Sequence, residues 1–251
     1  MPSDYQSLEA ELHDAFWDSE DSPELEWLDA LLSQNSGPAL EVGSGSGRLL
    51  LPLLEKGHEV EGLEPSSAML DLCRDKAADM NLSPVLHAGT MAELDTPTRY
   101  QSILIPAFTL QLSADPGADL DTLRKHLLPN GLLYLTTFIP FAEIDGELPE
   151  NEWYPDHELE LEDGRIATLL SRHQIDRENQ LLHREHHYKL SGGNGDREHH
   201  SKQSVRWFTA FQLHKLLTDH GFEPEQGIGD FDEEEPISDE AQILTVLARK
   251  I

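Results

Sequence analysis

The sequence is poor in cysteine and lacks long apolar runs, and each shortage excludes a class of protein. Cys73 is the only cysteine among 251 residues, which excludes an internal disulfide and a metal cluster built on cysteine. No run of about 18 apolar residues occurs, so we expect no transmembrane helix and no membrane partner. The first residues are acidic and lack a cationic segment followed by an apolar one, so no secretory signal is visible. A cytoplasmic protein is the resulting expectation.

Positive charge is also scarce. The chain carries 48 aspartates and glutamates against 18 lysines and arginines, a formal net charge of −30. Such a field repels phosphate backbones, so we expect no nucleic-acid partner. Two explanations of the acidity remain open. One is adaptation to salty surroundings, where ions screen the self-repulsion, and the other is an ordinary acidic surface that keeps the protein soluble.

Residues 38–69, by contrast, are rich in glycine and leucine. The short apolar run Ala39–Val42 predicts a strand, and leucines along Arg48–Lys56 predict a helix that is buried on one side. Val60–Leu63 predicts a second strand, which ends at Glu64. The loop between the first strand and the helix contains three alternating glycines: Gly43, Gly45 and Gly47. A strand, crossover helix and strand of this length predict parallel pairing with a right-handed connection.

This arrangement predicts a binding site for a nucleoside. A glycine loop that opens a helix offers unpaired backbone N–H groups and the positive end of the helix dipole, which suit a carboxylate or a phosphate. Glu64, at the end of the second strand, is placed to accept hydrogen bonds from ribose hydroxyls. We therefore expect a ligand that contains a nucleoside across the carboxyl ends of the strands.

The glycine pattern distinguishes between two kinds of nucleoside cofactor. The dinucleotide fingerprint G-x-G-x-x-G needs a third glycine where this chain has Arg48. The pattern present is E-x-G-x-G-x-G, and the acid Glu41 suits a cationic amino group better than a pyrophosphate. This pattern resembles motif I of the class I S-adenosylmethionine-dependent methyltransferases, over about residues 36–139 and 208–251. The resemblance implies S-adenosyl-L-methionine as the cofactor, with contacts from the loop and the two acids: Glu41, Gly43, Ser44, Gly45, Gly47 and Glu64.

The resemblance also implies cofactor contacts farther along the chain: Pro65, Met69, Gly89, Thr90, Met91, Pro106, Ala107 and Phe108. Met69 is a candidate for packing on the adenine, although an ordinary core methionine explains it equally well. Relatives often carry an acid directly after the glycine that corresponds to Gly89, whereas this chain has Thr90. The loop after Ile105 lacks the acidic or asparagine-proline-proline signature of base and glutamine methyltransferases, and resembles the small-molecule branch.

The expected fold class is α/β, with a Rossmann-like, doubly wound, seven-stranded and mostly parallel sheet. Residues 1–139 and 208–251 form the expected cofactor domain, in which residues 1–35 are an N-terminal helical cap. Residues 140–207 break the alternation of strand and helix, and they predict an antiparallel β lid inserted after strand five. We expect the acidic segment 232–240 to be a loop between the last two strands.

The insert and the leading helix supply the candidate acceptor contacts. With the period of a strand, Arg184, His186 and Tyr188 share one face, and His183, Glu185 and His187 share the other. The candidates for contact with the methyl acceptor are Tyr5, Trp17, Gln111, His186, Tyr188 and Arg206. Solvated histidines on strands explain most of the histidines of the insert, and no zinc-like spacing is complete, so no metal is expected.

The expected function is in-line transfer of the sulfonium methyl group to a nitrogen, oxygen or carbon nucleophile of a small molecule. Positioning and exclusion of water supply most of such catalysis, so the sequence points to no particular catalytic residue. Two alternatives stay open: an NAD-dependent oxidoreductase, and a protein that binds S-adenosylmethionine without turnover and acts through a partner. The oligomeric state is not determined by the sequence.

Overall fold

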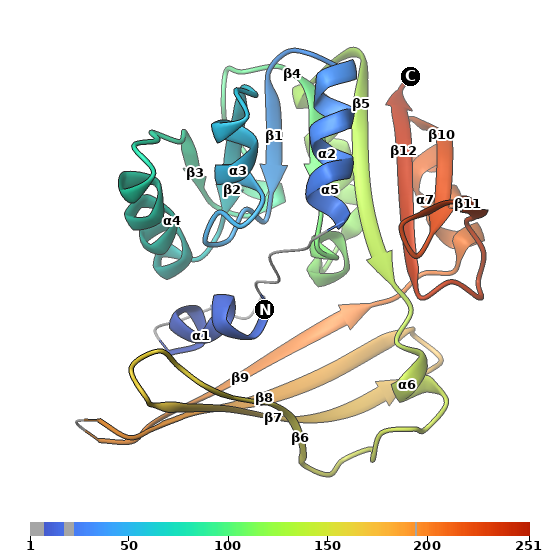
Figure 1. Ribbon diagram of the computed structural model, residues 1–251. Coiled ribbons are helices and arrows are strands. Elements are labelled where there is room, and N and C mark those ends of the chain that lie inside the picture. Colours follow the sequence, from blue (N-terminus) through green and yellow to red (C-terminus); the bar gives the residue numbers. More distant parts are fainter. Residues whose placement is uncertain (1–7, 18–22, 194) are drawn as a thin grey trace. The chain divides into compact units, whose positions relative to one another are not determined.

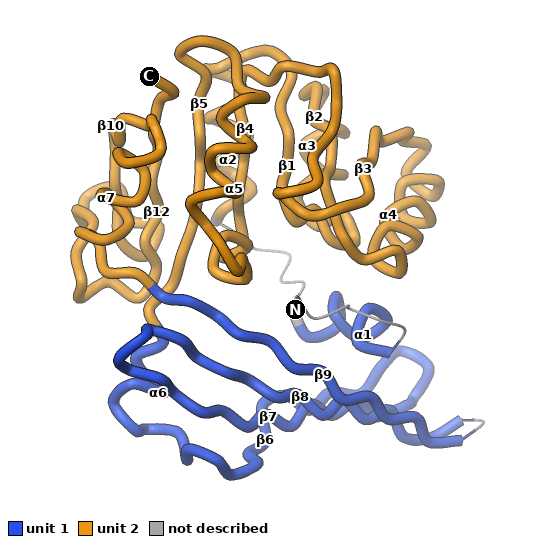
Figure 2. Tube along the Cα trace, turned by 180° about the vertical axis from the view of Figure 1, so that it is seen from behind, with its two compact units in different colours: residues 1–19, 140–207 blue, residues 20–139, 208–251 orange. Residues whose placement is uncertain are grey.

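The chain divides into two compact units in the computed structural model, which describes residues 8–17, 23–193 and 195–251. One unit contains the helix α1 (Leu8–Trp17) and the insert Pro140–Trp207, and the other contains the rest of the described chain (Figure 2). The leading helix was expected with the cofactor domain. It groups with the insert because Leu8 and Leu12 belong to an apolar cluster with residues of the insert sheet.

The larger unit is built on a mixed sheet with the strand order β11-β10-β12-β5-β4-β1-β2-β3 (Figure 1). Five parallel strands form one side: β1 (Ala39–Val42), β2 (Val60–Glu64), β3 (Leu86–Ala88), β4 (Tyr100–Ile105) and β5 (Leu127–Phe138). The others pair antiparallel: β10 (Phe222–Gly229), β11 (Asp232–Pro236) and β12 (Ile243–Lys250). The order turns back on itself between β1 and β4, the place where open α/β sheets bind ligands.

The sheet has one strand more than expected. Asp232–Pro236, interpreted from the sequence as part of a loop, pairs with β10 at the edge of the sheet, and all five of its residues are exposed. The segment carries four consecutive acids, a composition that disfavours a strand by propensity. Its charge also protects an exposed edge against pairing with another chain.

The strands of this unit alternate with helices: α2 (Pro23–Gln34), α3 (Leu50–Glu55), α4 (Ser67–Asp79), α5 (Pro116–His126) and α7 (Ala210–Asp219). Two short 3₁₀ turns lie between them: η1 (Met91–Glu93) and η2 (Thr109–Leu112). Caps set several helix starts. Ser66 accepts from the Met69 N–H at 3.3 Å, and Asp115 accepts from the Ala118 N–H at 3.1 Å. The apolar side of α3 packs into the core with Leu28 of α2 and Leu104 of β4.

The insert is an antiparallel meander in the order β6-β7-β8-β9, preceded by the short helix α6 (Phe141–Ile144) (Figure 1). Its strands are β6 (Tyr154–Glu160), β7 (Ile166–Asp176), β8 (Leu181–Ser191) and β9 (Arg197–Arg206). Burial alternates along β7 and β8, so one face of this sheet is covered and the other is open. Nowhere in the described chain is there a helix long and apolar enough to cross a membrane.

Candidate functional site

The loop between β1 and α3 follows the path that the three glycines predict. Gly43, Gly45 and Gly47 have φ angles of 74°, 53° and 91°, in the left-handed region that favours glycine. Backbone hydrogen bonds stabilise the turn. The N–H groups of Gly43 and Ser44 donate to the Leu63 carbonyl at 2.8 and 3.2 Å. The Gly47 N–H donates to the Ser44 carbonyl at 2.9 Å. The expectation that these N–H groups are unpaired is therefore wrong.

Only the middle glycine faces open space. A Cβ atom added at Gly45 meets no other heavy atom within 4 Å. A Cβ at Gly43 would lie 2.6 Å from the Thr109 hydroxyl, and one at Gly47 would lie 2.8 Å from the Cys73 Sγ. Gly43 and Gly47 are thus glycines for packing, whereas Gly45 leaves room for a ligand to approach the backbone.

Glu64 ties the glycine loop to the start of α4. One of its carboxylate oxygens accepts from the Gly45 N–H at 3.1 Å, and the other accepts from the Ser66 N–H at 2.8 Å. The side chain is only 5% exposed. A carboxylate has about four lone-pair positions, so Glu64 has the capacity for more than these two hydrogen bonds. The residue thus fits the role that the resemblance implies and also holds the loop in shape.

Glu41 has a buried carboxylate that lacks a hydrogen-bond partner at one oxygen. It lies on β1, is 2% exposed, and its Oε2 makes no hydrogen bond. Burial raises the pKa of this carboxyl well above its usual value, and the neighbouring acids Glu24 and Glu64 add to the increase, while Arg48 opposes it. The Ser44 hydroxyl is also buried without a partner. A cationic donor bound beside Glu41 would satisfy this oxygen and favour its ionised form.

Glu24, which the sequence analysis missed, completes a cluster of buried acids in this unit. Its Oε1 accepts from the Tyr134 hydroxyl at 3.0 Å, the Thr136 hydroxyl at 3.2 Å and the Ala107 N–H at 3.4 Å. Its other oxygen lies 3.9 Å from an Arg48 nitrogen. Burial raises the pKa of Glu24. No local signal marks this residue, because its hydrogen-bond partners on β5 and in the loop after β4 are more than 80 positions away in the sequence.

The loop after β4 is held in an unusual backbone conformation. Ala107 and Phe108 have φ angles of 50° and 65°, which residues other than glycine rarely adopt. Glu24 binds the Ala107 N–H, the Thr136 hydroxyl lies 3.5 Å from the Phe108 N–H, and the rings of Phe108 and Phe138 lie 4.9 Å apart. Strain of this kind concentrates at functional sites. The predicted cofactor loop of Pro106, Ala107 and Phe108 therefore has a fixed shape.

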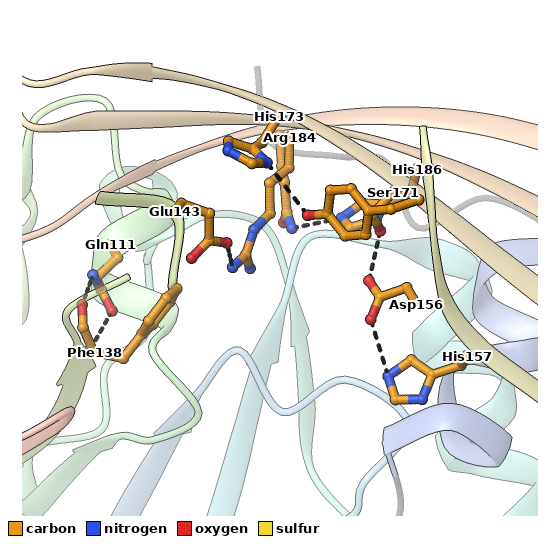
Figure 3. A network of polar contacts seen from close by, with 11 residues as sticks. Gln111, Phe138, Glu143, Asp156, His157, Ser171, His173, Arg184 and His186 are labelled. Atoms are coloured by element: carbon orange, nitrogen blue, oxygen red, sulfur yellow. Dashed lines mark hydrogen bonds and ion pairs between the residues drawn. The ribbon is translucent and has the colours of Figure 1, made fainter. Parts of the chain in front are cut away.

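Gln111 has a structural role in place of the predicted contact with the acceptor. Its side chain is 0% exposed. The amide nitrogen donates to the Phe138 carbonyl at 2.9 Å, and the amide oxygen accepts from the Phe138 N–H at 2.7 Å (Figure 3). This pair of bonds fixes the end of β5 to η2 and leaves the amide little capacity for a ligand.

The predicted adenine side of the site is more polar than the sequence indicates. Thr90 begins the turn η1, and its hydroxyl and N–H both donate to the Glu93 carboxylate, at 2.9 and 3.0 Å. An acid is therefore present beside Gly89, contributed by Glu93, three positions after Thr90. Met69 and Met91 are 2% and 8% exposed. The burial of Met69 favours its interpretation as a core methionine, and Pro65 is exposed.

In the other unit, α1 and the insert sheet share a buried acid. Glu9 accepts from the Tyr188 hydroxyl at 3.1 Å and from the Ser201 hydroxyl at 2.9 Å. The predicted acceptor contact Tyr188 is thus 4% exposed and bound to α1. Arg206 donates to the Asn179 carbonyl at 3.1 Å, at the turn between β7 and β8. Tyr5 and the Trp17 side chain lie outside the described residues.

His186 stands in a chain of polar side chains across the covered face of the insert sheet. Its Nδ1 lies 2.9 Å from the Ser171 hydroxyl, which donates to an Asp156 oxygen at 2.6 Å (Figure 3). Its Nε2 lies 3.0 Å from the Gln203 amide nitrogen, so the neutral ring donates from Nδ1 and accepts at Nε2. Burial lowers the pKa of His186 to about 4, with Arg184 contributing, so the ring is neutral at neutral pH.

A β-bulge brings Asp156 into this chain. The pairing of β6 with β7 shifts register between Pro155 and His157, so the extra residue at 156 turns toward Ser171. Beside it, Arg184 pairs with the buried Glu143 of α6, and the Tyr154 hydroxyl lies 3.4 Å from the His173 Nδ1. The insert thus presents a polar network on the face that carries His186.

The geometry of the larger unit defines a class of protein. A parallel sheet with a glycine loop after its first strand, an acid at the end of its second strand and an open approach at Gly45 fits a nucleoside cofactor. The Glu41 oxygen without a hydrogen-bond partner and the acids around it fit a nucleoside cofactor that carries a positive charge. A bound positive charge favours the ionised form of these carboxyl groups. The resemblance assigns Glu41 to the amino group of S-adenosylmethionine and Glu64 to its ribose, and the geometry is compatible with these predicted roles.

Comparison with known proteins agrees. A methyltransferase domain model matches residues 39–131. The chain is 26% identical over 214 residues to the dTDP-3-amino-3,6-dideoxy-alpha-D-glucopyranose N,N-dimethyltransferase of Streptomyces fradiae, covering 79% of this chain and 76% of that protein. The CcbJ methyltransferase of Streptomyces caelestis superposes with a TM-score of 0.78 at 25% identity, over 100% of this chain and 99% of that one. CalS10 of Micromonospora echinaspora, an amino pentose methyltransferase solved with S-adenosylmethionine, superposes with a TM-score of 0.68 at 21% identity, over 95% and 96% of the two chains.

The matching domain model, the relatives and the solved structures together support assignment of the chain to the class I S-adenosylmethionine-dependent methyltransferases. Its cofactor is S-adenosylmethionine, and the predictions of family, fold class and activity are confirmed. The oxidoreductase and the non-catalytic alternative are not favoured. When bound, the cofactor supplies a methyl group on a sulfonium, which is already a good leaving group. The contribution of the chain is to bind, orient and exclude water.

Proposed function

We propose that the protein methylates an amino nitrogen of a small polar molecule, with an amino sugar as the acceptor class. One observation carries the proposal: the similarity to the amino-sugar N,N-dimethyltransferase extends over 214 residues. This is more than the cofactor unit, Glu20–Ile139 with Phe208–Ile251, contains. The similarity therefore extends beyond the cofactor unit into the rest of the chain.

The chemistry of the insert supports an amine acceptor. An amine is protonated at neutral pH, so a carboxylate in its site can hold the ammonium form and accept the proton that the nitrogen must lose before it attacks. Asp156 provides such a group: its side chain is 29% exposed, and it is fixed by the Ser171 hydroxyl at 2.6 Å. His186 remains neutral behind Ser171, so it adds no positive charge that would repel the ammonium. In this proposal Asp156 binds the acceptor and His186 positions Asp156 through Ser171.

The test is turnover with matched acceptors. The protein is incubated with S-adenosylmethionine and pairs of nucleotide sugars that differ only in an amino or a hydroxyl group, and products are identified by mass spectrometry. The expected result is methylation of the amino member of a pair and none of the hydroxyl member. Methylation of the hydroxyl sugars instead would overturn the choice of nitrogen.

A substitution tests the role of Asp156. Asp156→Asn removes the charge but keeps the shape, so KM for the amine should rise at least about tenfold, as expected for loss of a charged contact of about 1.4 kcal/mol or more. Glu158→Gln is the matched control, since Glu158 is an exposed acid on the same strand whose backbone pairs with Thr168. Equal KM values for the two variants would remove Asp156 from the acceptor site.

A small-molecule acceptor without nucleic acid fits this proposal and the acidity of the chain. The cytoplasmic location stays a prediction.

A further inference from the structure

On the open face of the insert sheet, two histidines and a glutamate converge on one point. His187 of β8 and His200 of β9 are directly opposite in the strand register, and their rings stack with centroids 3.8 Å apart and planes 21° apart. Glu198 lies two positions before His200 on the same strand, so its side chain shares the face. Its Oε2 is 2.7 Å from the His187 Nε2. One ligand atom from each residue lies within 4.8 Å of the other two.

We propose that His187, Glu198 and His200 form a binding site for a divalent transition metal such as Zn²⁺, separate from the methyl-transfer chemistry. Two imidazoles and one carboxylate are a ligand set that Zn²⁺ uses in proteins, at about 2.0 to 2.2 Å from the metal. The fourth position is left for water. Within the part of the chain that the structure describes, this is the one group of such residues with converging ligand atoms.

The side chains need only a small adjustment to bind a metal. Ligands at these bond lengths lie about 3.3 Å from one another in a tetrahedron, against the 4.8 Å limit within which the three atoms now lie. Glu198 is 63% exposed at its side chain, so it can move at little cost. The metal would take the place of the hydrogen bond between His187 and Glu198. The two histidines come from adjacent strands whose backbones are already hydrogen-bonded in the required register.

The surroundings hold the two rings in place. The Trp153 ring packs in an edge geometry with both imidazoles, with ring centroids 6.1 Å apart for His187 and 6.2 Å apart for His200. The Arg172 guanidinium lies over the Trp153 ring, 4.9 Å from its centroid. The net charge of −30 also attracts cations to the protein.

A metal at this place would join β8 to β9 close to the loop that connects them. The sequence shows no zinc-like spacing, because the two histidines are 13 positions apart. Only the antiparallel register of β8 and β9 brings them opposite each other. The expected consequence of binding is a more stable insert sheet, since a ligand that binds only the folded state raises the stability of that state.

The site is tested with Zn²⁺ itself, on the full chain without a histidine tag and after treatment with a chelator. Calorimetric titration of the wild type should show saturable binding of one Zn²⁺ per chain. His200→Ala and Glu198→Gln should each weaken that binding at least about tenfold, because each removes one of three ligands. His183→Ala is the matched control, because His183 is an exposed histidine of β8 on the same face, bonded to Ser204. It should bind Zn²⁺ as the wild type does.

A spectroscopic readout identifies the ligands. The electron paramagnetic resonance spectrum of bound Cu²⁺ should show coupling to two imidazole nitrogens in the wild type and to one in His200→Ala, with circular dichroism confirming that each variant is folded. Absence of saturable Zn²⁺ binding by the folded wild type would overturn the proposal. So would equal affinities of the wild type and the two ligand variants.

Discussion

At the scale of single residues, the three glycines of the loop have different tasks although they look alike in the sequence. All three adopt positive φ angles, but only Gly45 borders open space. Gly47 is enclosed by Cys73 and Leu51, so any side chain there must displace the core. Gly45 should therefore matter for cofactor binding and Gly47 for folding, and substitutions can measure the two effects separately.

Two substitutions distinguish these tasks. Gly45→Leu should leave the protein folded but lower its affinity for S-adenosylhomocysteine at least about tenfold, because the side chain fills the open approach. Gly47→Ala should lower the free energy of unfolding by about 1 to 3 kcal/mol, because its Cβ would lie 2.8 Å from Cys73 and from Leu51. Calorimetric titration and denaturant unfolding of both variants check this. Full affinity in folded Gly45→Leu would contradict the loop assignment.

His186 makes stability depend on pH. Its pKa in the folded protein is about 4, below its usual value of 6.5, so the unfolded chain binds more protons between these values. Stability is therefore complete above about pH 6.5 and falls as the pH decreases toward 4, by at most about 1.4 kcal/mol per pH unit from this residue. His186→Asn, which does not titrate, should lose less stability than the wild type between about pH 7 and about pH 5.

The difference in stability between the wild type and His186→Asn isolates the contribution of His186 to the pH dependence. Glu24 and Glu41 have raised pKa values, so their contributions change with pH in the opposite direction, but they are common to both proteins and cancel in the difference. Urea unfolding at a series of pH values measures it. Parallel curves for wild type and variant would show that His186 is not held neutral by burial.

At the scale of elements, distant polar side chains fix the loops that follow β4. Glu24 of α2 binds groups on β5 and on the loop after β4, and Gln111 of η2 clamps the backbone of Phe138. Each bond joins elements that are far apart in the sequence. The left-handed conformations of Ala107 and Phe108 persist because the surroundings determine them.

Loss of the Gln111 clamp should be a folding defect and not a binding defect. Gln111→Leu leaves the N–H and the carbonyl of Phe138 without these partners, so the free energy of unfolding should fall by about 2 to 4 kcal/mol. The exposed Gln226 supplies the control, since Gln226→Ala should change stability by less than about 0.5 kcal/mol. Chemical denaturation measures both. If Gln111→Leu kept its stability but lost acceptor affinity, the original interpretation of Gln111 as an acceptor contact would be restored.

At the scale of the whole molecule, the excess of acids is the dominant electrostatic feature. A net charge of −30 destabilises the compact state through self-repulsion, and dissolved ions screen that repulsion. The midpoint of thermal unfolding should therefore rise between about 0.05 M and about 1 M KCl. A midpoint that stays constant or falls over this range would remove salt adaptation as the explanation of the acidity.

The cofactor part of the fold was predicted from the sequence because its signals are local. The apolar run before the glycines gave β1 with its observed bounds, Ala39–Val42, and the acid at the end of β2 was identified as Glu64. Leucine spacing and helix caps set the neighbouring helices. The antiparallel β structure of the insert was also predicted, because the alternation of side chains and the turn residues are local to each strand and each connection.

What the tertiary structure alone decided is which side chains meet. Glu24 reaches Tyr134 across 110 positions, Tyr188 reaches Glu9 across 179, and a bulge turns Asp156 toward Ser171. The strand β11 was missed because an acidic segment has low strand propensity, and its pairing with β10 overrides that propensity. Sequence patterns report periodicity and local bonding. Contacts between distant elements depend on the register and packing of the folded chain, which no local pattern contains.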